Sequence, residues 1–355
     1  MANQITFGNS HYIAQREKPM RNSKKIKIIA EAAQGFEGDP LLARLLVRAA
    51  ARAGADAVKF QLVYADEIAT PEYKYYDLFK KLEMPATCWR QVAGEAKKEG
   101  IGLYFDVFGK KSLRMAIALG AQGLKIHATD FYHDELIRAA LNTGKSILIG
   151  LGGLGEKDLG SLFERHPGIK TTQVTMMHGF QAEPTPLAAN NLLRLGTLGA
   201  LCQPAGIGFM DHSDGVKEDA LELSLMALPL GVSVVEKHIT LDRELQLEDY
   251  VSALSPACFK KFVKKIRKYG KALGSSAIEP GSGEKMYRSK SAKIIVAARK
   301  LKKGNLLRKE DLKLLRVDKQ ETLPAIFDPK EILGLRVSRK IPRHHPILKR
   351  FLYKE

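Results

Sequence analysis

The sequence predicts a (β/α)8 barrel followed by a small β-rich second domain, and three observations support this prediction. Eight apolar runs of strand character alternate with amphipathic segments of helical length between residues 26 and 273. Several helical segments end at a glycine, which commonly closes a helix. After residue 273, a segment rich in glycine and serine leads into a strongly basic region. Eight such units in roughly 250 residues are typical of this barrel.

The predicted strands are apolar runs that end in charged or turn-forming residues, and they cover residues 26–31, 57–63, 102–108, 123–128, 146–151, 173–180, 206–212 and 232–239. The predicted helices between and after them cover residues 41–53, 86–98, 110–119, 134–142, 157–165, 188–198, 217–228 and 256–273. An open doubly wound sheet would show the same alternation. However, no G-x-G-x-x-G motif follows the first strand, and eight units favour closure.

The remaining segments flank this barrel. Residues 1–25 are largely polar and are expected to form a loose arm or a small hairpin that closes the bottom of the barrel. Residues 274–292 are predicted to be a linker, and residues 293–355 a basic, β-rich domain. In that domain we expect a strand at 293–298, a turn at 301–304 and a short helix-like segment at 306–315.

The composition is that of an ordinary globular protein, with 45% hydrophobic and 27% charged residues in a chain of 355. No apolar run approaches the roughly 18 residues that span a bilayer, so no membrane association is expected. The N-terminus lacks the apolar core of a signal peptide, which predicts a cytoplasmic location. Three scattered cysteines (Cys88, Cys202 and Cys258) show neither a metal-binding spacing nor a disulfide framework.

Positive charge is concentrated near the C-terminus. The formal net charge is +18, and residues 288–355 contain 20 Lys+Arg against 7 Asp+Glu. Such charge is compatible with nucleic acid, an anionic surface or acidic substrates. Few aromatic residues lie among these cations, which argues against stacking on single-stranded bases. We therefore expect a solvated basic surface and do not expect nucleic-acid binding.

Polar side chains gather where the predicted strands end, which is the active-site end of a parallel barrel. They are Glu31, Lys59, Gln61, Asp106, Lys125, Asp130, His178, Gln181, Asp211, His212, Glu236 and His238. A single histidine there is most often structural. Two histidines, His212 and His238, each beside a carboxylate, favour a divalent metal site. Two buried lysines are rare unless paired or functional, and they favour an anionic substrate.

Several of these segments resemble the sialic acid (N-acetylneuraminate) synthase family. Residues 29–31 read I-A-E, and residues 53–61 read A-G-A-D-A-V-K-F-Q, which matches the family nearly letter for letter. K-I at 125–126, D-H-S at 211–213 and E-K-H at 236–238 are similar to further family motifs. K-I-I-V-A-A at 293–298 and K-G at 303–304 resemble its antifreeze-like (SAF-type) C-terminal domain.

The resemblance implies a metal-dependent condensation of phosphoenolpyruvate with an N-acetylated hexose such as N-acetylmannosamine. His212 and His238 would bind Mn²⁺, with Mg²⁺ or Co²⁺ as alternatives. Glu31 would lie near the reacting water, Lys59 and Lys125 would hold phosphoenolpyruvate, and Asp249 would bind a sugar hydroxyl. The family also implies a homodimer with exchanged C-terminal domains, in which Arg288 or Lys293 reaches the other chain's site. The implied assignment adds Asp211 and Glu236 to the catalytic residues, and Gln61, Asp130 and Gln181 to the substrate-binding residues.

The chain departs from the family pattern at several of these positions. Family serines that contact phosphate correspond to Ala128, Gly150 and Met210, and a family threonine becomes Asp106. The sixth-strand motif becomes H-G-F-Q-A-E-P at 178–184 and loses its asparagine and tyrosine. Three alternatives therefore stand beside the synthase. They are a divergent barrel aldolase or lyase with a non-phosphorylated donor, a non-catalytic homologue, and, on charge alone, a nucleic-acid-binding protein.

Overall fold

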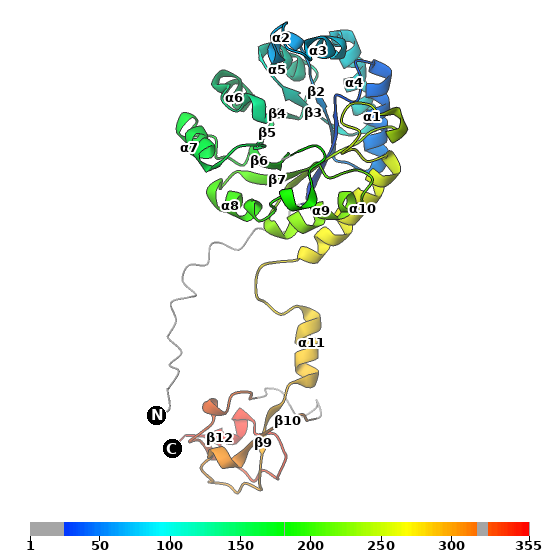
Figure 1. Ribbon diagram of the computed structural model, residues 1–355. Helices are drawn as coiled ribbons and strands as arrows, with labels where there is room; N and C mark the ends of the chain where they lie inside the picture. Colours follow the sequence, from blue (N-terminus) through cyan, green and yellow to red (C-terminus); the bar gives the residue numbers. More distant parts are fainter. Residues whose placement is uncertain (1–24, 181, 318–325, 355) are drawn as a thin grey trace. The chain divides into compact units, whose positions relative to one another are not determined.

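The computed structural model describes residues 25–180, 182–317 and 326–354, and the chain divides into two units between Ser275 and Ser276. The first unit is a closed barrel of parallel strands with helices around it (Figure 1). The strands are β1 (Lys27–Ala33), β2 (Ala57–Gln61), β3 (Gly102–Val107), β4 (Gly123–Ile126), β5 (Ser146–Gly150), β6 (Val174–Gly179), β7 (Gly206–Asp211) and β8 (Val234–His238). The predicted (β/α)8 barrel is thus confirmed, because β1 pairs with both β2 and β8.

The core has two layers, one on each face of the barrel wall. Strand residues are buried on both faces, as expected for a parallel sheet covered by helices. Inside the barrel, apolar side chains such as Ile29, Tyr104 and Met177 fill the interior below the C-terminal ends of the strands. Outside it, Phe60, Phe105 and Trp89 pack edge-on beneath the helices, with 5.4 Å between the ring centroids of Trp89 and Phe105.

The barrel unit's α-helices are α1 (Pro40–Ala53), α2 (Ala65–Ile68), α3 (Tyr76–Leu82), α4 (Ala86–Glu99), α5 (Lys110–Ala118), α6 (Asp134–Leu141), α7 (Glu156–Arg165), α8 (Arg194–Leu201), α9 (Asp219–Ala227) and α10 (Pro256–Gly270). Helix α1 shows how sequence sets such bounds. The Asp39 carboxylate accepts a hydrogen bond from the Leu41 amide (2.6 Å), and Gly54 ends the helix with a φ of 89°. No helix in the described ranges is long and apolar enough to cross a membrane.

Three helical predictions differ from the structure. The short helices α2 and α3 were not predicted, because neither is long enough to show a clear apolar periodicity. The helix predicted at 188–198 is replaced by a 3-10 turn (Leu187–Ala189) and α8, since the Asn190 side chain bonds back to carbonyls of the turn. The helix-like segment predicted at 306–315 is wrong: it forms a 3-10 turn (Lys309–Asp311) and strand β10 (Leu312–Leu315).

The last difference has a local cause. The Asp311 carboxylate accepts a hydrogen bond from the Arg308 amide (3.1 Å), which limits the 3-10 helix to a single turn. Strand β10 then pairs antiparallel with β9 (Ile294–Ala297). The short β11 (Arg336–Val337) and β12 (Leu352–Tyr353) form a second antiparallel pair. The buried apolar centre of this C-terminal unit includes Ile295, Leu301, Leu307, Val337 and Ile341.

The segment predicted to be a linker contains a helix, α11 (Ser282–Ser291). Glu284 accepts a hydrogen bond from the Gly281 amide (2.6 Å) and so starts the helix. The arm or hairpin predicted for residues 1–25 lies outside the described residues except for Lys25.

The strand register brings the predicted polar side chains together at one end of the barrel. Glu31 on β1 lies opposite Lys59 on β2 and His238 on β8. Asp106 on β3 lies opposite both Gln61 on β2 and Lys125 on β4. Because neighbouring parallel strands end at the same edge, residues as far apart in the sequence as Glu31 and His238 become neighbours.

Candidate active site

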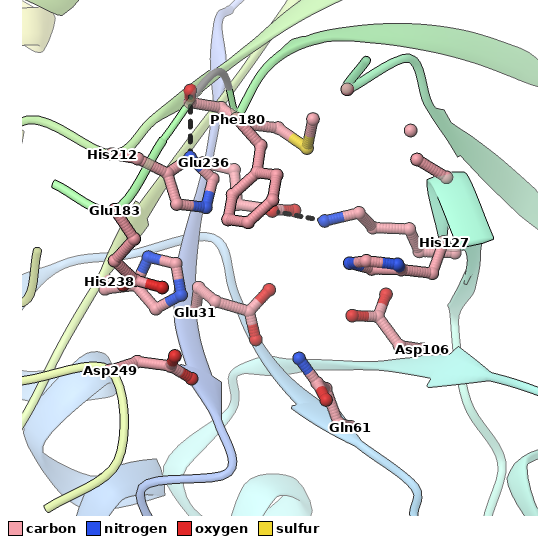
Figure 2. Close-up of a pocket in the computed structure, with 15 residues that line it drawn as sticks. Glu31, Gln61, Asp106, His127, Phe180, Glu183, His212, Glu236, His238 and Asp249 are labelled. Carbon is pink, nitrogen blue, oxygen red and sulfur yellow. Dashed lines mark hydrogen bonds and ion pairs between the residues drawn. The ribbon is translucent and has the colours of Figure 1, made fainter. Parts of the chain in front are cut away.

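A pocket opens at the C-terminal ends of the barrel strands (Figure 2). Its walls are formed by Glu31, Gln61, Asp106, Lys125, His127, Ala128, Gly150, Gly152, Phe180, Glu183, Met210, His212, Glu236, His238 and Asp249. The walls are mainly polar, whereas the barrel interior below them is apolar. The pocket therefore can bind a small polar molecule.

Two buried lysines and three buried carboxylates form the floor cluster, which we define as Glu31, Lys59, Asp106, Lys125 and Glu236. Lys59 donates to Asp106 (2.8 Å) and is ion-paired with Glu31. Lys125 donates to Glu236 (2.6 Å), and this contact is marked in Figure 2. Oδ1 of Asp106 and Oε2 of Glu236 are buried without a hydrogen-bond partner among the described residues.

The unequal numbers of cations and carboxylates affect the ionisation of the floor cluster. Burial raises the pKa of Glu31 to about 8, even though Lys59 opposes this shift. Burial also acts to raise the pKa of Glu236, but Lys125 and Lys59 lower it to about 2. Burial would lower the pKa of Lys59, whereas Asp106, Glu236 and Glu31 together raise it above its ordinary value. At neutral pH, the cluster thus has a charged Lys59, a charged Glu236 and a Glu31 carboxyl that can hold a proton.

Two imidazoles stand side by side on the opposite wall. The ring centroids of His212 and His238 are 4.9 Å apart, and one nitrogen of His212 faces the Met210 carbonyl oxygen at 3.3 Å. Nδ1 of His238 is buried and has no partner among the described residues. Burial lowers the pKa of His212 to about 4 and that of His238 well below its ordinary value. Both rings are therefore neutral at pH 7, as metal-ligating imidazoles are.

Two carboxyl groups lie next to His238. Glu183, His238 and Asp249 each offer a ligand atom, and these atoms all lie within 4.8 Å of one another. Burial raises the pKa of Asp249 to about 7, with Glu183 adding to the shift. Burial likewise raises the pKa of Glu183. The residues present thus fit a divalent ion, since neutral imidazole and carboxylate ligands converge on one point.

One predicted catalytic residue is wrongly placed by the sequence argument. Asp211 does not line the pocket, because its side chain points to the outside of the barrel wall. There it accepts from Lys237 (3.0 Å) and from Ser224 of α9 (2.8 Å). Adjacent residues of a strand face opposite sides, so Asp211 and His212 cannot both face the pocket. Asp211 is a structural partner of Lys237.

The other predicted residues fall into three groups. Glu31, Gln61, Lys125, His212, Glu236, His238 and Asp249 line the pocket, and Lys59 lies at its floor. Asp130 lies in the 3-10 turn after β4, near Thr129 and His133, and does not line the pocket. Gln181 lies outside the described residues. Arg288 belongs to α11 of the C-terminal unit, where its guanidinium lies 5.5 Å from the Phe327 ring centroid.

The sequence prediction omitted three pocket residues: His127 and Phe180 lie at the ends of the predicted strands 123–128 and 173–180, and Glu183 lies in a loop without periodicity. His127 follows β4, and burial lowers its pKa to about 4. Phe180 follows β6 with a φ of 59°, and its ring centroid is 5.0 Å from that of His212. Glu183 lies in the same loop as Phe180. The one sequence signal that could have identified Glu183 is its position within the H-G-F-Q-A-E-P motif at 178–184.

The model of the NeuB family matches residues 46–277, which is more than half of the chain. The chain belongs to the NeuB family. The SAF domain model matches residues 292–352 of this NeuB-family chain, which confirms the predicted antifreeze-like domain.

Relatives of this NeuB-family chain include several synthases. The N,N'-diacetyllegionaminic acid synthase of Campylobacter jejuni is 28% identical over 305 residues, covering 81% of this chain and 90% of that protein. The human N-acetylneuraminate-9-phosphate synthase is 26% identical over 339 residues, covering 88% of each chain. A sialic acid synthetase structure from Leptospira borgpetersenii, in complex with citrate, superposes with a TM-score of 0.69 at 27% identity, covering 75% of this chain and 92% of that one.

Proposed function

We propose that this chain condenses phosphoenolpyruvate with the open-chain aldehyde of an N-acetylated hexose, giving a nonulosonic acid and phosphate. The observation that carries the proposal is the pocket itself: buried lysines at its floor and a cluster of imidazoles and carboxyls on the facing wall. The named relatives support it, because those with an assigned product make sialic, pseudaminic or legionaminic acids.

The proposed reaction balances without an oxidant or reductant. C3 of phosphoenolpyruvate forms a bond to the aldehyde carbon, and the aldehyde oxygen takes up a proton. Water adds its oxygen to C2, loses a proton, and phosphate leaves as the C2 ketone forms. Nothing else is consumed.

The chain's own groups have distinct roles in this scheme. Lys59 and Lys125 supply the positive charge that holds the anionic donor. Glu31, whose pKa is raised to about 8, exchanges a proton with the reacting water or the aldehyde oxygen. Gln61 and Asp249 line the pocket and would bind sugar hydroxyls. A divalent ion, Mn²⁺ in the first instance, would be held at His212 and His238 and would supply Lewis-acid polarisation of a carbonyl oxygen.

A second donor is favoured by one observation. Ala128, Gly150 and Met210 line the pocket without any hydroxyl, and Asp106 adds a buried carboxylate beside Lys59. Carboxylates repel phosphate, so a non-phosphorylated, pyruvate-like donor is the alternative substrate. The proposal also includes a homodimer, as the resemblance implies, and a location in the cytoplasm.

Phosphate release decides between these donors. We expect phosphate to appear when the protein is mixed with phosphoenolpyruvate, Mn²⁺ and a panel of N-acetylated hexoses, together with a product of matching mass. In a parallel mixture with pyruvate in place of phosphoenolpyruvate, consumption of pyruvate would support the second donor. If neither donor reacts with any sugar of the panel, the proposed condensation is wrong.

A further inference from the structure

A second cluster of titratable groups lies on the wall opposite the floor cluster, and we call it the wall cluster: Glu183, His238 and Asp249. The three come from separate segments, namely the loop after β6, the end of β8 and the loop that follows β8. Their ligand atoms lie within 4.8 Å of one another. One ion about 2.1 Å from each ligand atom requires separations of up to about 4.2 Å. Shifts of less than an ångström would therefore suffice to bind it.

An independent observation comes from His238. Its side chain is only 6% exposed, yet Nδ1 has no hydrogen-bond partner within the described part of the chain. Figure 2 shows the His238 ring close to Glu183 and Asp249, and all three residues line the pocket. A buried polar atom without a partner is unfavourable, so this position is arranged to receive a ligand.

The charge balance of the wall cluster indicates what that ligand is. Glu183 and Asp249 are near neighbours, and in the described ranges neither forms an ion pair with a lysine or an arginine. The buried lysines Lys59 and Lys125 are already paired in the floor cluster. Two carboxyl groups beside a neutral imidazole, with no lysine or arginine paired to them in the described ranges, favour a cation from outside the chain.

We propose that Glu183 binds the divalent ion directly, so that this chain's metal site consists of His238, Asp249 and Glu183, with the neighbouring His212 as a further ligand. This inference rests on the proposed metal at the two histidines and extends it to a mixed nitrogen and oxygen ligand set, in which Asp249 binds the ion instead of the sugar hydroxyl that the resemblance implies. Such a set suits Mn²⁺, Fe²⁺ and Co²⁺. Two carboxylates would also neutralise the charge of the ion and hold it more firmly than imidazoles alone.

Metal binding to the full-length protein tests this inference without reference to catalysis. Mn²⁺ affinity is measured by calorimetry and by the electron paramagnetic resonance signal of free Mn²⁺. We expect Glu183→Gln to weaken binding by about 10–100-fold. The matched control is Glu244→Gln, which makes the same change of charge at an exposed residue outside the pocket and should stay within twofold of the unaltered protein.

Two further measurements separate a lost ligand from a damaged fold. Glu183→Asp keeps a carboxylate and should recover part of the affinity. The visible spectrum of bound Co²⁺ should change in Glu183→Gln, because the band positions and intensities follow the ligand set. The metal should also raise the melting temperature of the unaltered protein more than that of Glu183→Gln.

The outcomes separate this inference from the proposed function. If His238→Ala loses Mn²⁺ but Glu183→Gln binds as tightly as the unaltered protein, Glu183 is not a ligand and the histidine site stands. If the unaltered protein binds neither Mn²⁺ nor Co²⁺, the inference is also wrong, whereas the phosphate-release assay still decides the condensation. Weaker binding in Glu183→Gln together with an unchanged Glu244→Gln supports the inference.

Discussion

Two groups of buried lysines and carboxylates lie on opposite sides of the barrel wall, and they differ in how fully their bonding capacity is used. Outside the wall, Lys237 donates to Asp211 Oδ1 (3.0 Å), to the Ser213 carbonyl oxygen (2.8 Å) and to Ser213 Oγ (3.0 Å). The second carboxylate oxygen of Asp211 accepts from Ser224. One cation thus meets one carboxylate, and the Lys237 ammonium and both carboxylate oxygens of Asp211 have partners.

The floor cluster inside the wall is different. It holds three carboxylates for two lysines, and buried oxygens of Asp106 and Glu236 lack hydrogen-bond partners among the described residues. Both groups are built from the same residue types and are similarly buried from solvent. We infer that unused bonding capacity, rather than buried charge by itself, distinguishes the candidate site from the structural pair of Asp211 and Lys237.

The largest expected effect comes from making the same substitution in both groups. Asp211→Asn leaves the Lys237 ammonium buried without a counter-charge, and we expect it to lower the free energy of unfolding by about 3–5 kcal/mol. Asp106→Asn leaves Lys59 paired with Glu31, so we expect a loss of no more than about 1 kcal/mol. Denaturant unfolding of both variants measures the difference.

The double variant Asp211→Asn with Lys237→Met is the control for this comparison. It removes both charges, and it should recover part of the stability lost in Asp211→Asn, because an apolar replacement of a buried pair is often tolerated. Equal losses for Asp211→Asn and Asp106→Asn would contradict the distinction between the two groups.

The comparison also explains what the sequence could predict. Strand alternation placed Glu236 and His238 on one face and Lys237 on the other, and the structure agrees. The same rule, applied to Asp211 and His212, would have excluded Asp211 from the pocket. The barrel followed from eight repeated units because that pattern is spread over about 250 residues and tolerates local errors.

Loop residues were beyond the reach of this reasoning. Glu183 lies in a segment without periodicity, so nothing in the local pattern says where its side chain points. Its position depends on contacts with distant segments, as when the Thr185 amide donates to the His212 carbonyl oxygen (2.8 Å). Such contacts become visible only when the whole barrel is assembled. His127 differs, because it lies two residues after Lys125 in the predicted strand 123–128, and strand alternation would have placed both on one face.

A smaller effect is expected from pH at His127, on the pocket side of the wall. Burial lowers the pKa of His127 to about 4, whereas the unfolded chain has a pKa near 6.5. Between these values the unfolded state binds more protons, so the stability contributed by the neutral ring is lost as pH falls from about 6.5 to about 4.

His127→Gln removes this proton uptake. We expect unfolding free energies measured from pH 7 to pH 4 to fall less steeply in His127→Gln than in the unaltered protein. The exposed His344→Gln serves as the control and should keep the original slope. Parallel pH profiles for the unaltered protein and His127→Gln would show that this ring is not buried in its neutral form.

The smallest expected effect concerns the hydroxyls that are absent from the pocket wall. Ala128, Gly150 and Met210 line the pocket where the family resemblance implies serines that contact phosphate. A hydrogen bond to a charged group is worth about 1.5–3 kcal/mol, but an added hydroxyl must also be desolvated and held in one orientation.

Restoring serine at Gly150 is hindered, because a Cβ atom there would lie 3.2 Å from the Ala128 amide nitrogen. Ala128→Ser with Met210→Ser avoids this contact, and we expect it to tighten phosphoenolpyruvate binding by about tenfold, corresponding to about 1.4 kcal/mol. Ala128→Val with Met210→Leu, which adds no hydroxyl, is the control in calorimetric titrations. Micromolar binding of phosphoenolpyruvate by the unaltered protein would show that backbone amides or the floor lysines already replace the missing hydroxyls.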